Sequence, residues 1–235
     1  MIKAFQKKDE VGGCTNSTFL TLIPKEVNPK TFERFWPISL CNASYKFLAK
    51  LLANRLKPLL GNLISPLQGG FVKGRHLIDN VIQVQEALHS SHIRKEKGML
   101  IKLDMSNAFD WFKLSFIYKI LLSFGFSAEF VNLIKACTYR PWITPLVNGR
   151  PTDFFQATRG LCQGCPLSPF LCILLAESLS RKLTVGREVG SIPGIKATRG
   201  VDPINHALFA DDSHILGGAS IKITRAFIEI IQHFY

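Results

Sequence analysis

The chain has 235 residues, of which 47% are hydrophobic and 20% are charged, so it can bury a substantial core and its composition is not that of a disordered segment. Its 29 Lys and Arg residues against 17 Asp and Glu residues give a formal net charge of +12, which suits a polyanionic partner such as nucleic acid. No apolar secretory signal follows Met1, and the longest apolar stretch, residues 169–179, is too short to span a bilayer.

The N-terminal quarter of the chain predicts a strand, a loop and a helix. Apolar residues and threonines over 17–25 are typical of a strand, and two prolines within 28–40 indicate a loop that enters a strand or turn. From Asn42 to Leu60 the apolar residues recur at helical spacing, and Asn42 or Ser44 is a suitable N-cap.

The middle of the chain is predicted to be mainly helical. A loop over 63–75 precedes a helix near 77–93, and a compact apolar run at 98–105 indicates a buried strand. Apolar residues at helical spacing then predict two further helices, over 113–124 and 128–139.

The C-terminal part mixes strands with helices. Residues 143–158 are typical of a hairpin that turns at Asn148–Gly149, and a glycine-rich segment enters a long apolar helix over 160–183. Residues 206–216 predict a strand, a turn and a second strand, and 219–235 predict a last helix. Because strands and helices do not alternate regularly, we expect an α+β fold with an antiparallel sheet backed by helices.

Carboxylates stand at the ends of two predicted strands. Asp104 ends one apolar run, while Asp211 and Asp212 interrupt another, where adjacent charges are costly unless something pairs with them. If the two strands are neighbours, the three carboxylates cluster at one sheet edge, and such hard oxygen ligands suit Mg²⁺. Two such ions can clamp an in-line phosphoryl transfer. Asp110 is a further candidate carboxylate, and an ordinary polar turn is the alternative interpretation of the aspartate pair.

Three ordered motifs resemble those of a reverse transcriptase: "LDMSNAFD", "RGLCQGCPLSP" and "FADD". The chain is similar, more narrowly, to the reverse transcriptase domain of plant LINE-type non-LTR retrotransposons, through "TFLTLIPKEVNP", "QGGFVKGRHLIDNV" and "LVNGRPTDFF" as well. The likeness extends from about Phe19 to the end. It implies a right-hand polymerase fold, with partial fingers at 1–97 and an incomplete palm at 98–235, and with the thumb absent.

The resemblance also implies roles for individual residues. Asp104, Asp211 and Asp212 match the carboxylates that hold two catalytic Mg²⁺ ions. Phe109 matches the aromatic residue that screens the sugar of the incoming nucleotide, because its ring would clash with a 2′-hydroxyl.

The other implied contacts concern the nucleotide and the template. Gln163 and Gly164 match a loop that packs against both, where glycine lets the backbone approach closely. Lys25 and Arg75 match positions near the incoming nucleotide and the template, although a single Lys or Arg is more often a solvated surface charge.

The implied reaction is RNA-directed DNA synthesis. The partners would be an RNA template, a DNA primer and deoxynucleoside triphosphates (dNTPs), with Mg²⁺ as cofactor. The scattered cysteines indicate an intracellular protein, and the family implies the nucleus. Whether this chain by itself is active is left open.

The sequence departs from the family at three positions where an arginine or another basic residue is usual: Trp36, Trp111 and Cys162. C-to-T changes in arginine codons produce both tryptophan and cysteine, so we hypothesise an old, mutating copy. A charge-assisted contact to phosphate would be lost at Trp36, at a cost of about 1.5–3 kcal/mol.

Three alternatives follow from these departures and from the missing parts. In the first alternative, the chain is a catalytically decayed, nucleic-acid-binding remnant, since phosphate binding needs only distributed positive charge. It is another palm-type enzyme such as a nucleotide cyclase, which the "GLCQGCPLSP" loop and Phe109 disfavour. Or it does not fold stably.

Two apparent metal motifs carry little weight. Cys162 and Cys165 have C-x-x-C spacing, but no second pair follows at zinc-finger spacing. His89 and His92 lie three residues apart on a predicted helix without an evident carboxylate partner, so we interpret them as solvated or capping side chains.

Overall fold

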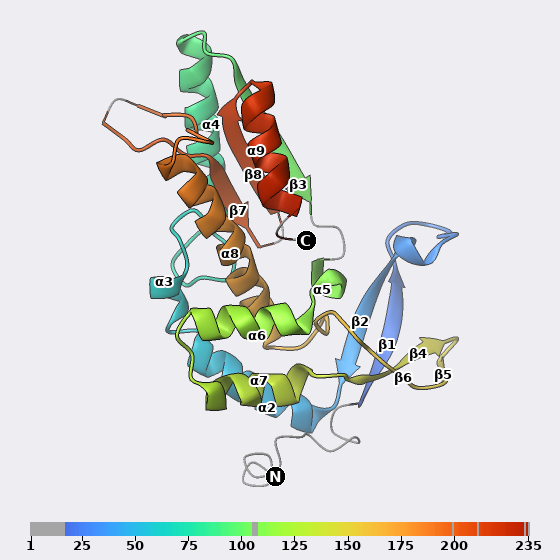
Figure 1. Cartoon of the computed structure of the whole chain (residues 1–235). Helices are drawn as coiled ribbons and strands as arrows, with labels where there is room; N and C mark the ends of the chain where they lie inside the picture. The colour runs from blue at the N-terminus through green and yellow to red at the C-terminus, as the bar shows by residue number, and fades with distance from the viewer. Residues whose placement is uncertain (1–16, 105–107, 199, 211, 233, 235) are drawn as a thin grey trace. The chain divides into compact units, whose positions relative to one another are not determined.

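The computed structural model describes residues 17–104, 108–198, 200–210, 212–232 and 234, and these form two compact units (Figure 1). The first unit takes its described residues from Met1–Pro58 and Asn107–Leu171, and the second takes its from Leu59–Ser106 and Cys172–Tyr235. The units therefore interleave along the sequence. The assignment of 1–97 to fingers and 98–235 to palm stays a prediction.

The first unit is built on a mixed sheet. Strand β1 (Ser17–Pro24) pairs antiparallel with β2 (Phe35–Cys41) and parallel with β4 (Trp142–Val147), in the order β2-β1-β4-β5. The predicted hairpin is present, because β4 pairs antiparallel with β5 (Arg150–Pro151) and with β6 (Phe155–Gln156). A short 3₁₀ turn, η1 (Phe32–Arg34), precedes β2.

Two helices of the first unit begin at side-chain caps. In α2 (Ala43–Leu56) the Asn42 side chain accepts a hydrogen bond from the Ser44 N–H, and in α7 (Ala128–Thr138) the Ser127 hydroxyl accepts one from Phe130. The remaining helices of this unit are α5 (Ala108–Trp111) and α6 (Leu114–Ser123).

The second unit contains a three-stranded antiparallel sheet, in keeping with the antiparallel sheet that the sequence predicts. Its order is β3 (Gly98–Asp104), β8 (Asp212–Gly218) and β7 (His206–Phe209). Helices α4 (Leu77–Ile93) and α9 (Ile221–Gln232) lie on this sheet, and α3 (Leu60–Leu63) is a short further helix.

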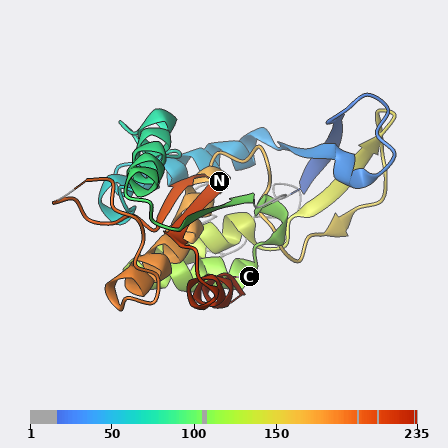
Figure 2. The same cartoon turned by 90° about the horizontal axis from the view of Figure 1, so that it is seen from above.

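Helices α4 and α9 cover opposite faces of this sheet (Figure 2). Val84 of α4 packs in one cluster with Leu216 of β8. The next residue, Gly217, points the other way, and a Cβ added to it would lie 3.1 Å from a ring carbon of Phe227 in α9. The predicted α+β arrangement, an antiparallel sheet backed by helices, is thus confirmed.

The long apolar helix α8 (Ser168–Glu188) supplies much of the buried core. Its buried hydrophobic residues are Leu171, Cys172, Ile173, Leu174, Leu175, Ala176, Leu179 and Leu183. Among the described residues, no helix is long and apolar enough to cross a membrane.

A buried polar network joins α8 to β7. The Asn205 Nδ2 donates to the Leu183 carbonyl, so its Oδ1 faces the His206 Nδ1 at 2.7 Å and that nitrogen carries the proton. The His206 Nε2 then accepts from the Ser180 hydroxyl at 2.7 Å. Burial lowers the pKa of His206 to about 3, so the ring is neutral at ordinary pH.

Candidate active site

The predicted carboxylates lie at a hairpin in the second unit. Asp104, the last residue of β3, is the direct antiparallel partner of Asp212, the first residue of β8. Phe209 at the end of β7 also pairs with Asp212, and two residues of the sequence separate these paired positions. The structure therefore brings Asp104 and Asp212 into register, whereas Asp211 lies outside the described residues.

A lysine that the sequence does not single out contacts this hairpin. The Lys102 ammonium lies 3.3 Å from an Asp212 carboxylate oxygen, and the two side chains are 59% and 44% exposed. The only sequence signal is position: Lys102 precedes Asp104 by two residues on the same strand, a spacing that places both residues on one face of the sheet. The ammonium compensates the carboxylate charge in this structure.

The donor chemistry at the hairpin fits a hard divalent cation. Two aspartates on neighbouring strands provide oxygen ligands of the kind Mg²⁺ prefers. The ion pair with Lys102 shows that positive charge is accommodated beside Asp212. Within the described ranges, no group of three His, Cys, Asp or Glu side chains is close enough to form a metal cluster.

Arg75, predicted near the template, is bonded to its own loop in the second unit. Its guanidinium donates to the carbonyls of Gly61, Ile64, Ser65 and Gln68. Four carbonyl partners give this arginine a structural role that sequence reasoning missed, and its role toward a template stays a prediction.

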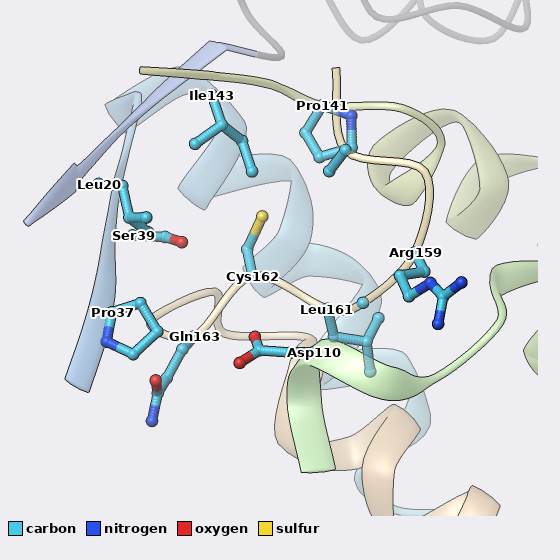
Figure 3. Close-up of a pocket in the computed structure, with 12 residues that line it drawn as sticks. Leu20, Pro37, Ser39, Asp110, Pro141, Ile143, Arg159, Leu161, Cys162 and Gln163 are labelled. Atoms are coloured by element: carbon cyan, nitrogen blue, oxygen red, sulfur yellow. The ribbon is translucent and has the colours of Figure 1, made fainter. Parts of the chain in front are cut away.

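The first unit contains a pocket of about 230 Å³ beside the glycine-rich loop. Figure 3 shows the Ser39, Asp110 and Cys162 side chains directed into the space between β2 and this loop. Burial raises the pKa of Asp110, and the positive charge of Lys25 partly offsets that rise. The pocket is thus lined by a carboxyl group, Asp110, whose pKa depends on burial and on the charge of Lys25.

Backbone contacts fix the loop that carries Gln163 and Gly164. The Leu161 N–H donates to the Phe109 carbonyl at 2.6 Å, and the Ser39 N–H donates to the Gln163 carbonyl at 2.7 Å. Gly164 has a φ of +107°, and a Cβ there would lie 2.9 Å from the Ser39 carbonyl oxygen. The structure therefore gathers Phe109, Gln163 and Gly164 around one loop, and this loop needs glycine at position 164.

Lys25 lies in the same unit but is exposed. Its ammonium donates to the Glu33 carbonyl at 3.0 Å, and its backbone N–H donates to the Arg34 carbonyl at 2.8 Å. These two bonds join Lys25, directly after β1, to the residues that lead into β2.

Two of the three atypical positions are described. Trp36 is 50% exposed on β2, opposite Ile23. Cys162 is half-buried in the pocket lining. The side chain of Trp111 lies outside the described part of the chain.

The two apparent metal motifs have ordinary surroundings. The Cys165 thiol and the Tyr45 hydroxyl form a hydrogen bond of 3.4 Å, so Cys165 has a partner other than a metal. His89 and His92 are both exposed on α4.

Comparisons with known proteins identify the family. Residues 23–235 match the family described as reverse transcriptase (RNA-dependent DNA polymerase). The chain is 34% identical over 191 residues to a "Retrovirus-related Pol polyprotein from type-2 retrotransposable element R2DM" of Drosophila melanogaster, covering 81% of this chain and 17% of the relative. It is 46% identical over 68 residues to an "Uncharacterized mitochondrial protein AtMg01250" of Arabidopsis thaliana, covering 29% of this chain and 56% of that protein.

A solved structure shows the same fold. The apo telomerase of Candida tropicalis, truncated from its C-terminal domain, superposes with a TM-score of 0.60 at 13% identity, covering 94% of this chain and 47% of that one. With the carboxylate hairpin and the ordered motifs in place, the chain belongs to the reverse transcriptase (RNA-dependent DNA polymerase) family, as a domain of the non-LTR retrotransposon type.

Proposed function

We propose that this chain performs the RNA-directed DNA polymerase reaction of a non-LTR retrotransposon, the addition of dNTPs to a DNA 3′-hydroxyl while an RNA template is copied. The observation that supports it most is the pairing of Asp104 with Asp212 at the ends of two antiparallel strands. The family match over residues 23–235 supports a metal-binding role for these carboxylates.

Asp104, Asp211 and Asp212 would hold two Mg²⁺ ions. When bound, the ions lower the pKa of the attacking hydroxyl and stabilise the leaving pyrophosphate. Asp212 is half-exposed and its charge is compensated by the Lys102 ammonium, so the carboxylate is accessible to an incoming ligand. The lysine would remain beside it as a source of positive charge.

The first unit would bind the nucleotide. Phe109 is partly buried, and its ring would exclude a 2′-hydroxyl, while the backbone at Gln163 and Gly164 would pack against the substrate. Lys25 would contribute positive charge toward the nucleotide, and Arg75 would lie near the template. Each of these roles follows from the family motif.

The partners would be an RNA template, a DNA primer and dNTPs. The net charge of +12 supports a polyanionic partner. The identity to the Arabidopsis protein supports a plant LINE-type origin. We further propose that the protein acts in the nucleus, which the location of a fluorescently labelled chain would test.

Primer extension on an RNA template with dNTPs and Mg²⁺ tests this function. We expect extension by the chain, loss of extension in the Asp211→Ala, Asp212→Ala double variant, and unchanged extension in Asp202→Ala, whose exposed carboxylate lies in the preceding loop. If the folded wild-type chain binds RNA without extending the primer, the polymerase proposal fails and the decayed, nucleic-acid-binding alternative takes its place.

A further inference from the structure

A buried glutamine touches the backbone of the aspartate hairpin. The Gln68 side chain is fully buried, and its Oε1 accepts hydrogen bonds from the N–H of Gly70 at 2.8 Å and of Ala210 at 3.0 Å. Ala210 is 142 residues away along the chain and directly precedes the Asp211–Asp212 pair. No motif in the sequence links these two residues.

The hairpin needs such a contact because of its length. A two-residue connection between antiparallel strands requires a left-handed backbone at its first residue, a conformation that favours glycine, asparagine or aspartate. Here the first residue is alanine, and Ala210 has a φ of 55°. A non-glycine residue persists in this region only where its surroundings hold it there.

The segment that carries Gln68 is fastened along the outer edge of β7. The Leu208 N–H donates to the Leu67 carbonyl at 2.7 Å, and the Leu208 carbonyl accepts from the Gly69 N–H at 2.9 Å. A Cβ on Gly70 would come within 2.6 Å of the Ala210 nitrogen, so only glycine permits this close approach.

Two further side chains hold the segment. The Asn80 Nδ2 donates to the Leu208 carbonyl, and the Arg75 guanidinium donates to the Gln68 carbonyl at 2.8 Å. Gln68 is therefore bonded to Arg75 through its carbonyl and to the hairpin through its side chain.

We propose that Gln68 is a positioning residue for the catalytic aspartates: its Oε1 holds Ala210 in the left-handed conformation and so fixes the backbone from which the Asp211–Asp212 pair begins. The catalytic consequence of this inference rests on the proposed function, whereas the hydrogen bond between Ala210 and Gln68 does not depend on it.

The variants separate the acceptor from the shape of the side chain. Gln68→Met keeps the length and loses the acceptor, whereas Gln68→Glu keeps an oxygen acceptor. The matched control is Gln83→Met, because the Gln83 Oε1 on α4 is buried and has no hydrogen-bond partner among the described residues.

The first measurement is amide hydrogen exchange at Ala210, resolved by NMR in the full chain. We expect exchange about ten-fold faster in Gln68→Met, the change that the loss of one ordinary hydrogen bond produces. Exchange should stay at the wild-type rate in Gln83→Met and remain slow in Gln68→Glu. If Gln68→Met does not fold, Gln68→Asn, which retracts the acceptor by one methylene, takes its place. Exchange at Ala210 that is equal in Gln68→Met and in Gln83→Met overturns the inference.

The second measurement is primer extension by the same variants. We expect Gln68→Met to lower kcat at an unchanged KM for dNTP, and Gln68→Glu, which keeps the acceptor, to retain the wild-type kcat. If the wild-type chain extends no primer, the proposed function fails while the exchange measurement still decides the role of Gln68. Normal kcat together with fast exchange at Ala210 would refute the positioning role.

Discussion

At the scale of single residues, His206 makes stability depend on pH. Its pKa is about 3 in the folded chain and about 6.5 when unfolded, so below pH 6.5 the unfolded chain binds a proton that the folded chain does not. The contribution of the neutral His206 ring to the free energy of unfolding is complete above about pH 6.5. It falls as the pH drops toward 3, by about 1.4 kcal/mol for each pH unit. We expect urea denaturation to show a steady loss from pH 7 to pH 5.

Variants isolate this contribution. His206→Asn should be less stable at pH 7 and should flatten the pH dependence, whereas the exposed His89→Asn should leave it unchanged. Glu177 acts in the opposite direction, because burial raises its pKa and the stability it contributes is lost as the pH rises. A slope that persists in His206→Asn would contradict the assignment.

A second residue-scale prediction concerns Lys102. Because its ammonium lies 3.3 Å from the Asp212 carboxylate, Lys102→Gln should remove a competing positive charge and tighten divalent-cation binding. Exposed ion pairs contribute up to about 1 kcal/mol, so we expect a gain of up to about five-fold in affinity. Titration calorimetry with Mg²⁺ would measure it, with the exposed Lys97→Gln as control. Weaker binding in Lys102→Gln would assign the lysine another role.

The sequence predicts part of this site because carboxylates interrupt apolar strands. Asp104 and Asp212 stand out against such strands, and the structure then shows that the two positions pair. Lys102 does not stand out, because a lysine on a strand has the appearance of a solvated charge. Gln68 accepts a hydrogen bond from Ala210, which lies 142 residues away in the sequence, and no local sequence pattern predicts such a contact.

At the scale of elements, the glycine-rich loop depends on Gly164. Gly164→Ala would place a Cβ at 2.9 Å from the Ser39 carbonyl oxygen in a backbone conformation of φ +107°. We expect a loss of about 1–3 kcal/mol in the free energy of unfolding. Gly149→Ala is the control, since its φ is +75° but no atom lies within 4 Å of the added Cβ. Equal losses in the two variants would exclude a role for the contact with β2.

Arg75 offers a second test at this scale. Its guanidinium reaches four carbonyls of the 61–68 loop, and a lysine presents one ammonium in place of that planar fork. We expect Arg75→Lys to lower the free energy of unfolding by about 1–3 kcal/mol, with the exposed Arg55→Lys near neutral. Template affinity that falls without any loss of stability would favour the template role instead.

Local patterns predict most of the elements but not how they pair. The helix cap at Asn42 and the turn at Asn148–Gly149 both appear where the sequence indicates. The parallel pairing of β1 with β4 does not follow from the sequence, since it joins Ser17 to Trp142 and depends on the fold as a whole. Helix α3 was also missed, because a single helical turn has too few residues to show periodicity.

At the scale of the whole molecule, the net charge of +12 predicts salt-sensitive binding to nucleic acid. Displaced counterions make affinity fall steeply with salt, by about three orders of magnitude between about 50 and about 200 mM for a protein that contacts six phosphates. Fluorescence anisotropy with a labelled RNA–DNA hybrid would measure the slope. An affinity independent of salt would rule out a binding surface built on distributed Lys and Arg.

The interleaving of the two units has a consequence for how the protein is made. Residues 17–20 form their parallel ladder with 142–145, so β1 and its antiparallel partner β2 emerge from the ribosome long before the second partner strand, β4, exists. Pairings of such large sequence separation fold slowly and leave strand edges open meanwhile. Shortened forms that stop before β4 would therefore leave one edge of β1 open to aggregation.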